Sequence, residues 1–481
     1  MKTFFKFDSS IFAIIVMGAL YILLPSSNNT LDALRYASEM RDGVDLFLPH
    51  HLLYNALGYV IVHPLGITKP LLFLCFINAV FAIGCLWIAR LILIPFTEEK
   101  TRTALIILLG ASFGFMRFAI DNEPYIIALF FSLLASWVLL TKKNIVGASL
   151  LAATACLFHQ IYFFWWLGLL IFIIQAFESA RIKSALQYIV PALIVPVCYF
   201  LVFTFTHTDV NNVVEFMFHD YIKYDYVSLT FKPVTLLLTP ISLARTFFQV
   251  HGYIPALLQR FNYLWIGVFL AVSFLIAALF SLKAAIVKKS QEPYEKKFAG
   301  THLYIFILQF LFAFISDGNA KFMVMMPFAL CIFLIITYQL KEKLLLYFAL
   351  GLFFWNLTFG LLPYHFYELT TNPGVSRYVQ SHPAGNYLLK DMVWADNLLR
   401  YYHPEQTYHL NNSRVLKEAT LDSLLSENPV ILTDLINNEA FMSRAKIISN
   451  VYDTLFEKYK LEQVDSFEYD LGKVRIYSIM K

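Results

Sequence analysis

Long apolar runs recur along the first 362 residues, and they set the expected fold class. A run of about 17–25 apolar residues is long enough to cross the hydrocarbon core of a bilayer as a helix. We predict eleven spanning helices, near residues 9–25, 70–95, 103–120, 124–141, 145–158, 161–177, 187–205, 262–282, 302–316, 322–339 and 344–362. The pattern therefore predicts an all-α polytopic membrane protein with exterior juxtamembrane helices and, as described below, a small C-terminal α/β domain.

One further apolar run, 51–65, is short and is flanked or interrupted by His50, His51 and Asn55. The charges of the loops decide whether it spans, because cytoplasmic loops carry an excess of lysine and arginine. If it does not span, every basic loop falls on the same side as Lys2 and Lys6; these loops hold Lys100/Arg102, Lys142/Lys143, Arg181/Lys183, residues 283–297 and Lys341/Lys343. We therefore expect the run to form a helix on the outer membrane surface.

This assignment puts the N-terminus in the cytoplasm and the C-terminus outside. Residues 1–24 resemble a signal peptide, but no small-x-small cleavage site follows the apolar run, so an uncleaved first helix is expected. The same assignment sends most of the unusual polar residues to the outer face, in residues 26–69, 121–124, 159–160, 206–261 and 317–321.

The composition changes after Pro363, where the chain becomes polar and ordinarily charged. We expect a transmembrane domain over 1–362, with a first exterior loop at 26–69, and a soluble exterior domain over 363–481. Residues 429–434 are typical of a buried strand, and 467–479 of a hairpin that turns near Gly472. Helical periodicity covers 385–401, 415–426 and 436–460.

Composition agrees with a membrane protein and excludes some other classes. Of the 481 residues, 59% are hydrophobic and only 15% charged, which leaves more apolar sequence than a soluble core can bury. The net charge of +4 and the absence of a long basic block argue against nucleic-acid binding. The five cysteines lie in apolar runs without a C-x-x-C pair, so we interpret them as buried packing residues.

The first outer loop contains a helical pattern in which Asp32, Arg35, Tyr36 and Glu39 share one face. Thr30 or Asn29 is expected to cap that helix. On spacing alone, a solvated amphipathic helix with internal ion pairs is the simpler interpretation. A functional role for Asp32 is the alternative.

A second acidic group, Asp121 and Glu123, lies in a tight turn before Pro124, where the next helix begins. One interpretation is structural, since carboxylates are favoured near a helix N-terminus. The other is that the two carboxylates face the first loop and accept a proton or hold a cation. His159 and Gln160 interrupt an apolar stretch at another outer turn, where a hydrogen-bonded packing histidine is the simpler expectation.

Cationic candidates also fall on the outer side. Lys321 enters the membrane from the outer surface, where its side chain either reaches lipid headgroups or binds a phosphate. Arg245, in the loop 206–261, is a weaker candidate of the same kind.

Together these motifs resemble the GT-C superfamily of membrane glycosyltransferases, which includes protein O-mannosyltransferases and lipid A aminoarabinose transferases. The resemblance covers residues 1–362 and rests on the order of loose motifs: Asp32-x-x-x-Tyr36-Ala37, Gly43, Pro49-His50-His51-Leu52-Leu53-Tyr54, Asp121-x-Glu123-Pro124 and Asn319-Ala320-Lys321-Phe322…Met326-Pro327. The chain departs from many members by lacking a second acid after Asp32 and by having Lys321 where arginine is common.

The resemblance implies transfer of a sugar from a polyprenyl phosphate or pyrophosphate donor to a lipid, glycan or protein acceptor at the exterior face of a bacterial cytoplasmic membrane. It implies Asp32 as the general base, Asp121 and Glu123 as support for the acceptor or a divalent ion such as Mg²⁺ or Mn²⁺, and Lys321 as the group that binds the donor phosphate. Arg245 is a second phosphate candidate, and Tyr36, His50, His51, His159 and Gln160 are further site candidates. A metal ion, if present, would involve Asp32, Asp121 and Glu123.

Three other functions remain open. An O-antigen polymerase or ligase usually places arginines in large exterior loops, whereas this first loop is acidic. A transporter or flippase tends to have repeated halves with broken helices at mid-membrane, and no such repeat is evident in the sequence. A non-catalytic assembly subunit is the third alternative, and the acidic motifs argue against it only weakly.

Overall fold

The computed structural model describes residues 8–206, 210–219, 221, 232–282, 287–413, 417–436 and 455–481. The chain forms two compact units. The first contains Met1–Pro25, Glu39–Gln249 and Ile266–Leu361, and the second contains Ser26–Ser38, Val250–Trp265 and Leu362–Lys481. Helix α2 (Leu31–Asp42) runs from residues of the second unit into residues of the first.

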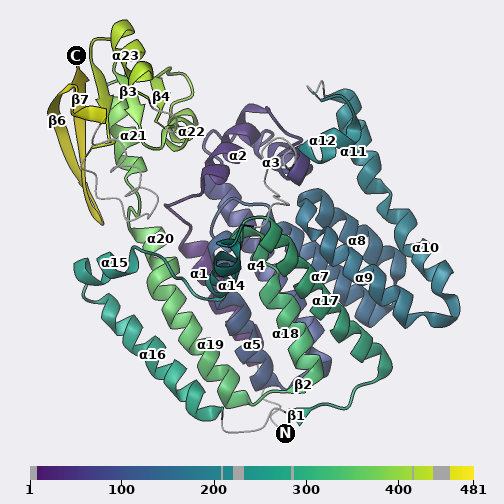
Figure 1. Ribbon diagram of the computed structural model, residues 1–481. Coiled ribbons are helices and arrows are strands. Elements are labelled where there is room, and N and C mark those ends of the chain that lie inside the picture. Colours follow the sequence, from purple (N-terminus) through teal and green to yellow (C-terminus); the bar gives the residue numbers. More distant parts are fainter. Residues whose placement is uncertain are drawn as a thin grey trace. The chain divides into compact units, whose positions relative to one another are not determined.

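The first unit is a bundle of apolar helices (Figure 1). Its α-helices are α1 (Ser9–Leu23), α3 (Tyr54–Val62), α4 (Leu71–Leu93), α5 (Glu99–Ala111), α6 (Phe113–Ala119), α7 (Tyr125–Lys142), α8 (Ile145–Phe158), α9 (Phe163–Ala176), α10 (Arg181–Ala192), α11 (Ile194–Phe205), α12 (Val213–Met217), α14 (Thr235–Phe247), α16 (Leu264–Ser281), α17 (Pro293–Ile315), α18 (Met326–Thr337) and α19 (Glu342–Asn356). Helix α7 packs between α4 and α8, and α17 packs against α9 and α18.

Short elements connect these helices. They are the 3₁₀ turns η1 (Pro49–His51), η2 (Ile94–Phe96), η3 (Gln160–Tyr162), η4 (Glu178–Ala180) and η5 (Ala320–Met323), the π-helical turn η6 (Leu357–Leu361), and the paired strands β1 (Val287–Lys288) and β2 (Tyr338–Gln339). Three of the 3₁₀ turns, η1, η3 and η5, carry residues that the sequence singled out as site candidates.

Within the described residues, seven helical segments are long and apolar enough to cross a membrane, and the bent pair α5–α6 would make an eighth. Three shorter apolar segments, Ser9–Leu23, Ile145–Phe158 and Gln160–Ala176, coincide with the remaining predicted spans. The protein is therefore a multi-pass membrane protein. The count of eleven, the orientation of the termini and the exterior placement of the C-terminal residues stay predictions.

The run 51–65 forms the helix α3, which has nine residues. At 1.5 Å per residue it is about 14 Å long, whereas a spanning helix must cover about 30 Å. The prediction that this run does not span is thus confirmed by its length.

The second unit contains a five-stranded mixed sheet with the order β4-β3-β5-β7-β6. Its strands are β3 (Asn386–Leu389), β4 (His409–Asn412), β5 (Ile431–Thr433), β6 (Lys460–Tyr469) and β7 (Gly472–Met480), and its helices are α15 (Ile254–Arg260), α20 (Leu362–Phe366), α21 (Asn372–Ser381), α22 (Met392–Tyr402) and α23 (Glu418–Glu427). Strands β3, β4 and β5 are parallel, and β7 is antiparallel to both β5 and β6. The predicted strand at 429–434 and the hairpin that turns near Gly472 are confirmed.

One predicted helix in this unit is partly wrong. The pattern at 385–401 predicts a helix throughout, but residues 386–389 form the buried inner strand β3, and α22 begins only at Met392. A short apolar run such as Tyr387-Leu388-Leu389 fits either a buried strand or a helix segment, so periodicity alone does not decide it. Of the predicted helix 436–460, residues 437–454 lie outside the described residues, and Lys460 begins strand β6.

Candidate functional site

A side chain of α4 holds the acidic turn between α6 and α7. The Asn78 amide donates to the backbone carbonyls of Asp121, at 2.6 Å, and of Glu123, at 2.7 Å. Both carboxylate residues are almost completely buried. Their position at the start of α7 is one where the helix dipole favours negative charge. Asn78 therefore fixes the backbone that carries the two acids.

Asp121 pairs with an arginine one helical turn before it. Arg117 Nη1 lies 2.8 Å from Asp121 Oδ2, and the Arg117 side chain is only 9% exposed. The other oxygen of Asp121 accepts a hydrogen bond from the Asn122 backbone at 2.9 Å. A buried charge pair of this kind loses several kcal/mol when one partner is removed, because the other charge is left in a poorly solvating environment. The pair therefore holds the turn in place.

Glu123 pairs with the predicted phosphate-binding lysine. Lys321 Nζ lies 3.1 Å from Glu123 Oε1, and the two residues differ in accessibility: the Glu123 side chain is 1% exposed and the Lys321 side chain 32%. Lys321 is thus the more accessible cation of this cluster, and Arg117 is the buried one.

The turn before η5 sets the direction from which Lys321 approaches. Asp317 and Gly318 both have positive φ, at 54° and 69°. A Cβ atom on Gly318 would lie 3.0 Å from the backbone nitrogen of Thr239, so α14 packs directly against this turn. Asn319 then caps η5 by accepting a hydrogen bond from the Lys321 backbone at 3.0 Å. This local geometry depends on glycine, which adopts positive φ without strain.

Three predicted histidines lie next to one another beside this cluster. The ring centroids of His50 and His51 are 4.1 Å apart, and those of His50 and His159 are 6.1 Å apart. The His159 ring also contacts Tyr125, at 4.7 Å, and Phe322, which follows Lys321, at 6.4 Å. Three segments therefore lie close together: the loop 49–54, the turn at 159–160 and η5. This agrees with the prediction that all three lie on the same side of the membrane.

His159 is held in its neutral form. Burial lowers the pKa of His159 well below its usual value, and the nearby His50 and Lys321 lower it further. Its Nδ1 atom accepts a hydrogen bond from the Ile161 backbone at 3.3 Å, which leaves the proton on Nε2. A neutral histidine with its donor nitrogen on the far side of the ring can donate a hydrogen bond to an anionic or hydroxyl oxygen.

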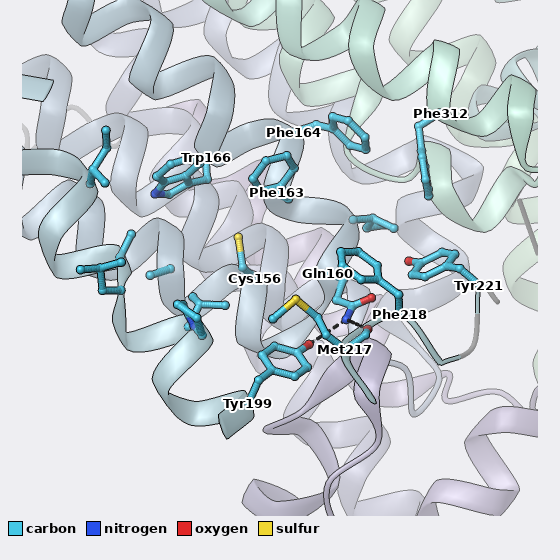
Figure 2. Close-up of a pocket in the computed structure, with 17 residues that line it drawn as sticks. Cys156, Gln160, Phe163, Phe164, Trp166, Tyr199, Met217, Phe218, Tyr221 and Phe312 are labelled. Atoms are coloured by element: carbon cyan, nitrogen blue, oxygen red, sulfur yellow. Dashed lines mark hydrogen bonds between the residues drawn. The ribbon is translucent and has the colours of Figure 1, made fainter. Parts of the chain in front are cut away.

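An apolar cavity of about 640 Å³ begins at Gln160. Figure 2 shows the Gln160 amide hydrogen-bonded to Tyr199 and to the backbone of Met217, with the aromatic rings of the cavity around it. The lining is otherwise aliphatic, aromatic and sulfur-containing and includes Cys156, Phe163, Phe164, Trp166, Phe218, Tyr221 and Phe312. Tyr199 also donates to the backbone carbonyl of Pro49, which ties the cavity wall to the loop with the histidines.

Two lining residues connect the wall of the cavity to the segments that carry the charged cluster. Phe312 lines the cavity and contacts Phe322, with ring centroids 5.4 Å apart, and Phe322 follows Lys321. On the other side, Gln160 lines the cavity and follows His159. Lys321 and His159 are not among the lining residues themselves; they lie on segments that adjoin the apolar cavity.

The other predicted residues have the following positions. Asp32 lies in the first turn of α2, capped by Thr30, whose hydroxyl accepts from the Ala33 backbone at 3.1 Å. Asp32 is half-buried and Tyr36 is buried, and both belong to the second unit. Arg245 lies near the end of α14 and is half-buried. Among the contacts of the described residues, no ion pair joins Arg245 to Asp121 or Glu123.

The sequence did not identify four residues that hold this site: Asn78, Arg117, Tyr54 and Tyr199. The Arg117–Asp121 spacing of four residues was a detectable signal for one of them. Tyr54, whose hydroxyl donates to Asn122 Oδ1 at 2.7 Å, and Tyr199 reach their partners from distant segments. Nothing in the local pattern marks such contacts.

The carboxylates of this cluster do not fit a divalent-cation site. Asp121 is already neutralised by Arg117, and Glu123 by Lys321. A divalent ion such as Mg²⁺ prefers several oxygen ligands and would be repelled by the two cations. Among the residues that the structure describes, no three histidine, cysteine, aspartate or glutamate side chains are arranged to hold a metal ion.

No protein-family model and no curated protein matches this chain by sequence. Among solved structures, it is similar to ArnT from Cupriavidus metallidurans bound to undecaprenyl phosphate, with a TM-score of 0.46, 10% identity, and coverage of 98% of this chain and 97% of ArnT. It is also similar to the oligosaccharyltransferase of Archaeoglobus fulgidus. In its apo form the TM-score is 0.48, with 12% identity and coverage of 90% and 70%. For its complex with Zn and sulfate the TM-score is 0.44 and the identity 13%, with coverage of 89% of this chain and 68% of the oligosaccharyltransferase. All are GT-C glycosyltransferases.

Proposed function

We propose that this protein is a membrane glycosyltransferase that takes a sugar from a polyprenyl-phosphate-linked donor and transfers it to an acceptor hydroxyl. The observation that carries the proposal is the Lys321–Glu123 pair, with a Nζ–Oε1 distance of 3.1 Å, on segments that adjoin the wall of an apolar cavity of about 640 Å³. The cavity suits an isoprenoid tail, and Lys321 suits its phosphate. The motif order of residues 1–362 supports the same function independently.

In this proposal Lys321 stabilises the charge that develops on the leaving phosphate. The acceptor oxygen forms a bond to the anomeric carbon, while the bond from that carbon to the phosphate oxygen breaks and its electron pair stays on the phosphate. A cation already held beside a buried carboxylate needs little reorganisation to meet this charge. His159, neutral with its proton on Nε2, is a second donor candidate for the same oxygen atoms.

The proton of the acceptor hydroxyl goes to Asp32. This role is carried over from the resemblance of Asp32-x-x-x-Tyr36-Ala37 to the family motif. Its supporting feature is the position of Asp32 in the first turn of α2, where the helix dipole favours the charged carboxylate that a base must present. No step in this mechanism passes through a metal ion, because Asp121 and Glu123 already have cationic partners.

Sugar transfer tests the function directly. Membranes with the wild-type chain are expected to transfer radiolabelled sugar from a polyprenyl-phosphate donor, and Asp32→Asn to lose at least about 100-fold of that rate, the lower end of the range for general-base catalysis. Equal rates for wild type and Asp32→Asn would remove Asp32 as the base. No transfer from any polyprenyl donor by a folded wild-type protein would contradict the function itself.

The cavity has its own matched pair of variants on α10. Ala192 lines the cavity, and Ala185, on the same helix, is not among the lining residues. Ala192→Trp is expected to weaken use of a long polyprenyl donor while sparing a short-chain analogue. Ala185→Trp is expected to change neither. Loss of activity with both chain lengths in Ala192→Trp would argue against the cavity as the site of the tail.

A further inference from the structure

The second unit contains a cavity of its own, of about 370 Å³. Three segments far apart in the sequence form it: the first loop through Ser27, Asn29 and Leu34, the segment 368–380 with α21, and the segment 394–403 with α22. Its volume lies near the lower end of the range of about 300–1,000 Å³ that is typical of ligand pockets. The cavity therefore suits a small ligand.

The walls combine aromatic and hydrogen-bonding side chains. Pro373, Ser376, Arg377 and Gln380 recur at three- and four-residue spacing and form one face of α21. Trp394, Leu398 and Tyr402 form the facing stripe of α22, and His403 follows it. A flat aromatic surface opposite amide and hydroxyl groups is the arrangement that an amphipathic ring with several hydroxyls requires.

Ser376 provides the observation that points to a ligand. Its side chain is 1% exposed, and its hydroxyl oxygen has no hydrogen-bond partner in the structure, although it belongs to the lining of the cavity. A buried hydroxyl without a partner costs about 1–3 kcal/mol. A ligand hydroxyl that occupies the cavity would remove this cost.

The first loop is fastened to the rest of the unit beside this cavity. The Asn28 amide donates to the carbonyls of Tyr364, at 3.1 Å, and Tyr367, at 2.6 Å, and its carbonyl accepts from the Leu369 backbone at 2.9 Å. Asn29, the next residue, is therefore held in the cavity wall. A wall built in advance lowers the entropy that a ligand loses on binding.

The charge of the cavity favours a neutral ligand. Arg377 makes a two-pronged pair with Glu368, at 2.7 Å and 2.9 Å, and both residues line the cavity. The guanidinium of Arg377 is thus already neutralised by the carboxylate beside it. No other charged side chain of the described residues lines the cavity, apart from the titratable His403. An anionic ligand would have to displace Glu368.

We propose that this cavity is a binding site for a small neutral saccharide, which stacks on Trp394 and Tyr402 and donates a hydroxyl hydrogen bond to, or accepts one from, Ser376. Binding itself is independent of the donor site described above. The further role of holding the glycan of an acceptor or product, next to the loop that carries Asp32, rests on the proposed glycosyltransferase function.

The test is binding of neutral methyl glycosides to the full chain in nanodiscs, measured by saturation-transfer NMR and titration. The probes are methyl glycosides of glucose, galactose, mannose and N-acetylglucosamine, with methyl glucuronide as the charged comparator. At least one neutral glycoside is expected to bind, and Trp394→Ala to weaken it at least 10-fold. Gln380→Ala, a milder change, is expected to weaken it about 3-fold or more.

Ser376→Ala separates a ligand-binding role from a structural one. It should weaken glycoside binding about 5- to 10-fold without lowering the melting temperature, because it removes a buried hydroxyl that has no partner in the free protein. Ser381→Ala, on the same helix but outside the cavity, is the matched control and should bind like wild type.

Three results would overturn the proposal: no binding of any neutral glycoside, binding that Trp394→Ala, Gln380→Ala and Ser376→Ala all leave unchanged, or a preference for the glucuronide. The double variant Lys321→Met/Glu123→Gln must retain glycoside binding. If the wild type binds glycosides but transfers no sugar, the proposed function fails and the saccharide site stands.

Discussion

Two groups of buried charges lie toward opposite ends of the first unit, and α4 reaches both. Asn78 holds the acidic turn with Asp121 and Glu123, while Arg90, twelve residues further along the same helix and so about 18 Å away, belongs to the other group. There Asp8 Oδ2 lies 2.5 Å from Arg90 Nη2 and 3.0 Å from Arg102 Nη2. Both groups combine carboxylates with cations in an apolar protein.

The two groups differ in what surrounds them. Arg90 and Arg102 are about 10% exposed at their side chains, both bind the same carboxylate, and neither lines a described cavity. Lys321 is one-third exposed, and its neighbours lead into the large apolar cavity. Buried charge alone therefore does not mark a functional site. We infer that the accessible cation near a large apolar cavity is the better candidate for a functional site.

The same contrast appears in the protonation states. Burial would raise the pKa of Asp8, but hydrogen bonds from Ser10 and Arg90 outweigh it and hold the pKa well below its usual value. Asp8 is thus a permanent anion between two permanent cations. At the other end His159 is kept neutral by burial, with its pKa lowered. In the Asp8 group, every charge is thus paired with an opposite charge, while the group with Lys321 also has a neutral hydrogen-bond donor, His159, next to its cation.

The largest expected effect is on stability and concerns the buried Arg117–Asp121 pair. Arg117→Met leaves Asp121 charged and buried, and is expected to cost about 3–5 kcal/mol of unfolding free energy. Restoring neutrality with Arg117→Met/Asp121→Asn should recover most of that loss. Thermal unfolding in detergent measures both variants. A single variant as stable as wild type would mean that the pair does not hold the turn.

The next effect is on transfer and distinguishes the two groups by function. Lys321→Met/Glu123→Gln, which leaves no unpaired charge, is expected to reduce sugar transfer by about 10²- to 10³-fold, the range for loss of one group that stabilises transition-state charge. Asp8→Asn should change transfer by less than about 2-fold after correction for the amount of folded protein. If the two variants lose equal activity, the contrast drawn here between the groups is wrong.

A smaller effect concerns the dependence of stability on pH. Because the pKa of His159 is lowered in the folded protein, the unfolded chain binds a proton below pH 6.5 that the folded chain does not. Stability should therefore fall as the pH drops below 6.5, by about 1.4 kcal/mol per pH unit until the folded-state pKa is reached. Asp8, whose pKa is also lowered, contributes stability that is lost only as the pH falls below its usual value of 3.8.

The control for this prediction is His159→Phe, compared with wild type by thermal unfolding between about pH 3 and 7.5. The variant should lose the slope below pH 6.5 while retaining the acid transition near and below pH 4. An unchanged slope in His159→Phe would show that another group titrates there.

The smallest expected effect is that of a chelator. Since Asp121 and Glu123 have cationic partners, extensive dialysis against EDTA should leave transfer within about 2-fold of its starting rate. A large loss that Mg²⁺ or Mn²⁺ restores would contradict the assignment of these carboxylates as partners of Arg117 and Lys321.

The sequence predicted much of the arrangement of these side chains, because the loop charges indicate on which side of the membrane each loop lies. Loop charges put Asp121, Glu123, His159 and Lys321 on one side of the membrane, and the structure brings these four residues of the first unit together. Side-chain contacts between distant segments could not be predicted, because no local pattern specifies that Tyr54 meets Asn122 or that Tyr199 meets Pro49.

Other limits were local. The strand β3 was taken as helix because Tyr387-Leu388-Leu389 fits either structure, and only its pairing with β4 and β5 settles it. The cavity beside Gln160 has no sequence signature, since its aromatic and aliphatic residues are typical of any membrane helix. Each of the eleven predicted apolar runs coincides with helical structure, because long apolar runs are unambiguous, but among the described residues only seven segments, or eight with the bent pair α5–α6, are long and apolar enough to cross a membrane.

The central claim is that Lys321, beside Glu123 and the apolar cavity, binds the phosphate of a polyprenyl lipid. Binding of undecaprenyl phosphate to purified protein in nanodiscs tests it most directly, with wild type compared to Lys321→Met/Glu123→Gln. The double variant is expected to bind at least about 10-fold more weakly, and undecaprenol, which lacks the phosphate, to bind both proteins equally. Equal affinity of the two proteins for undecaprenyl phosphate would contradict it.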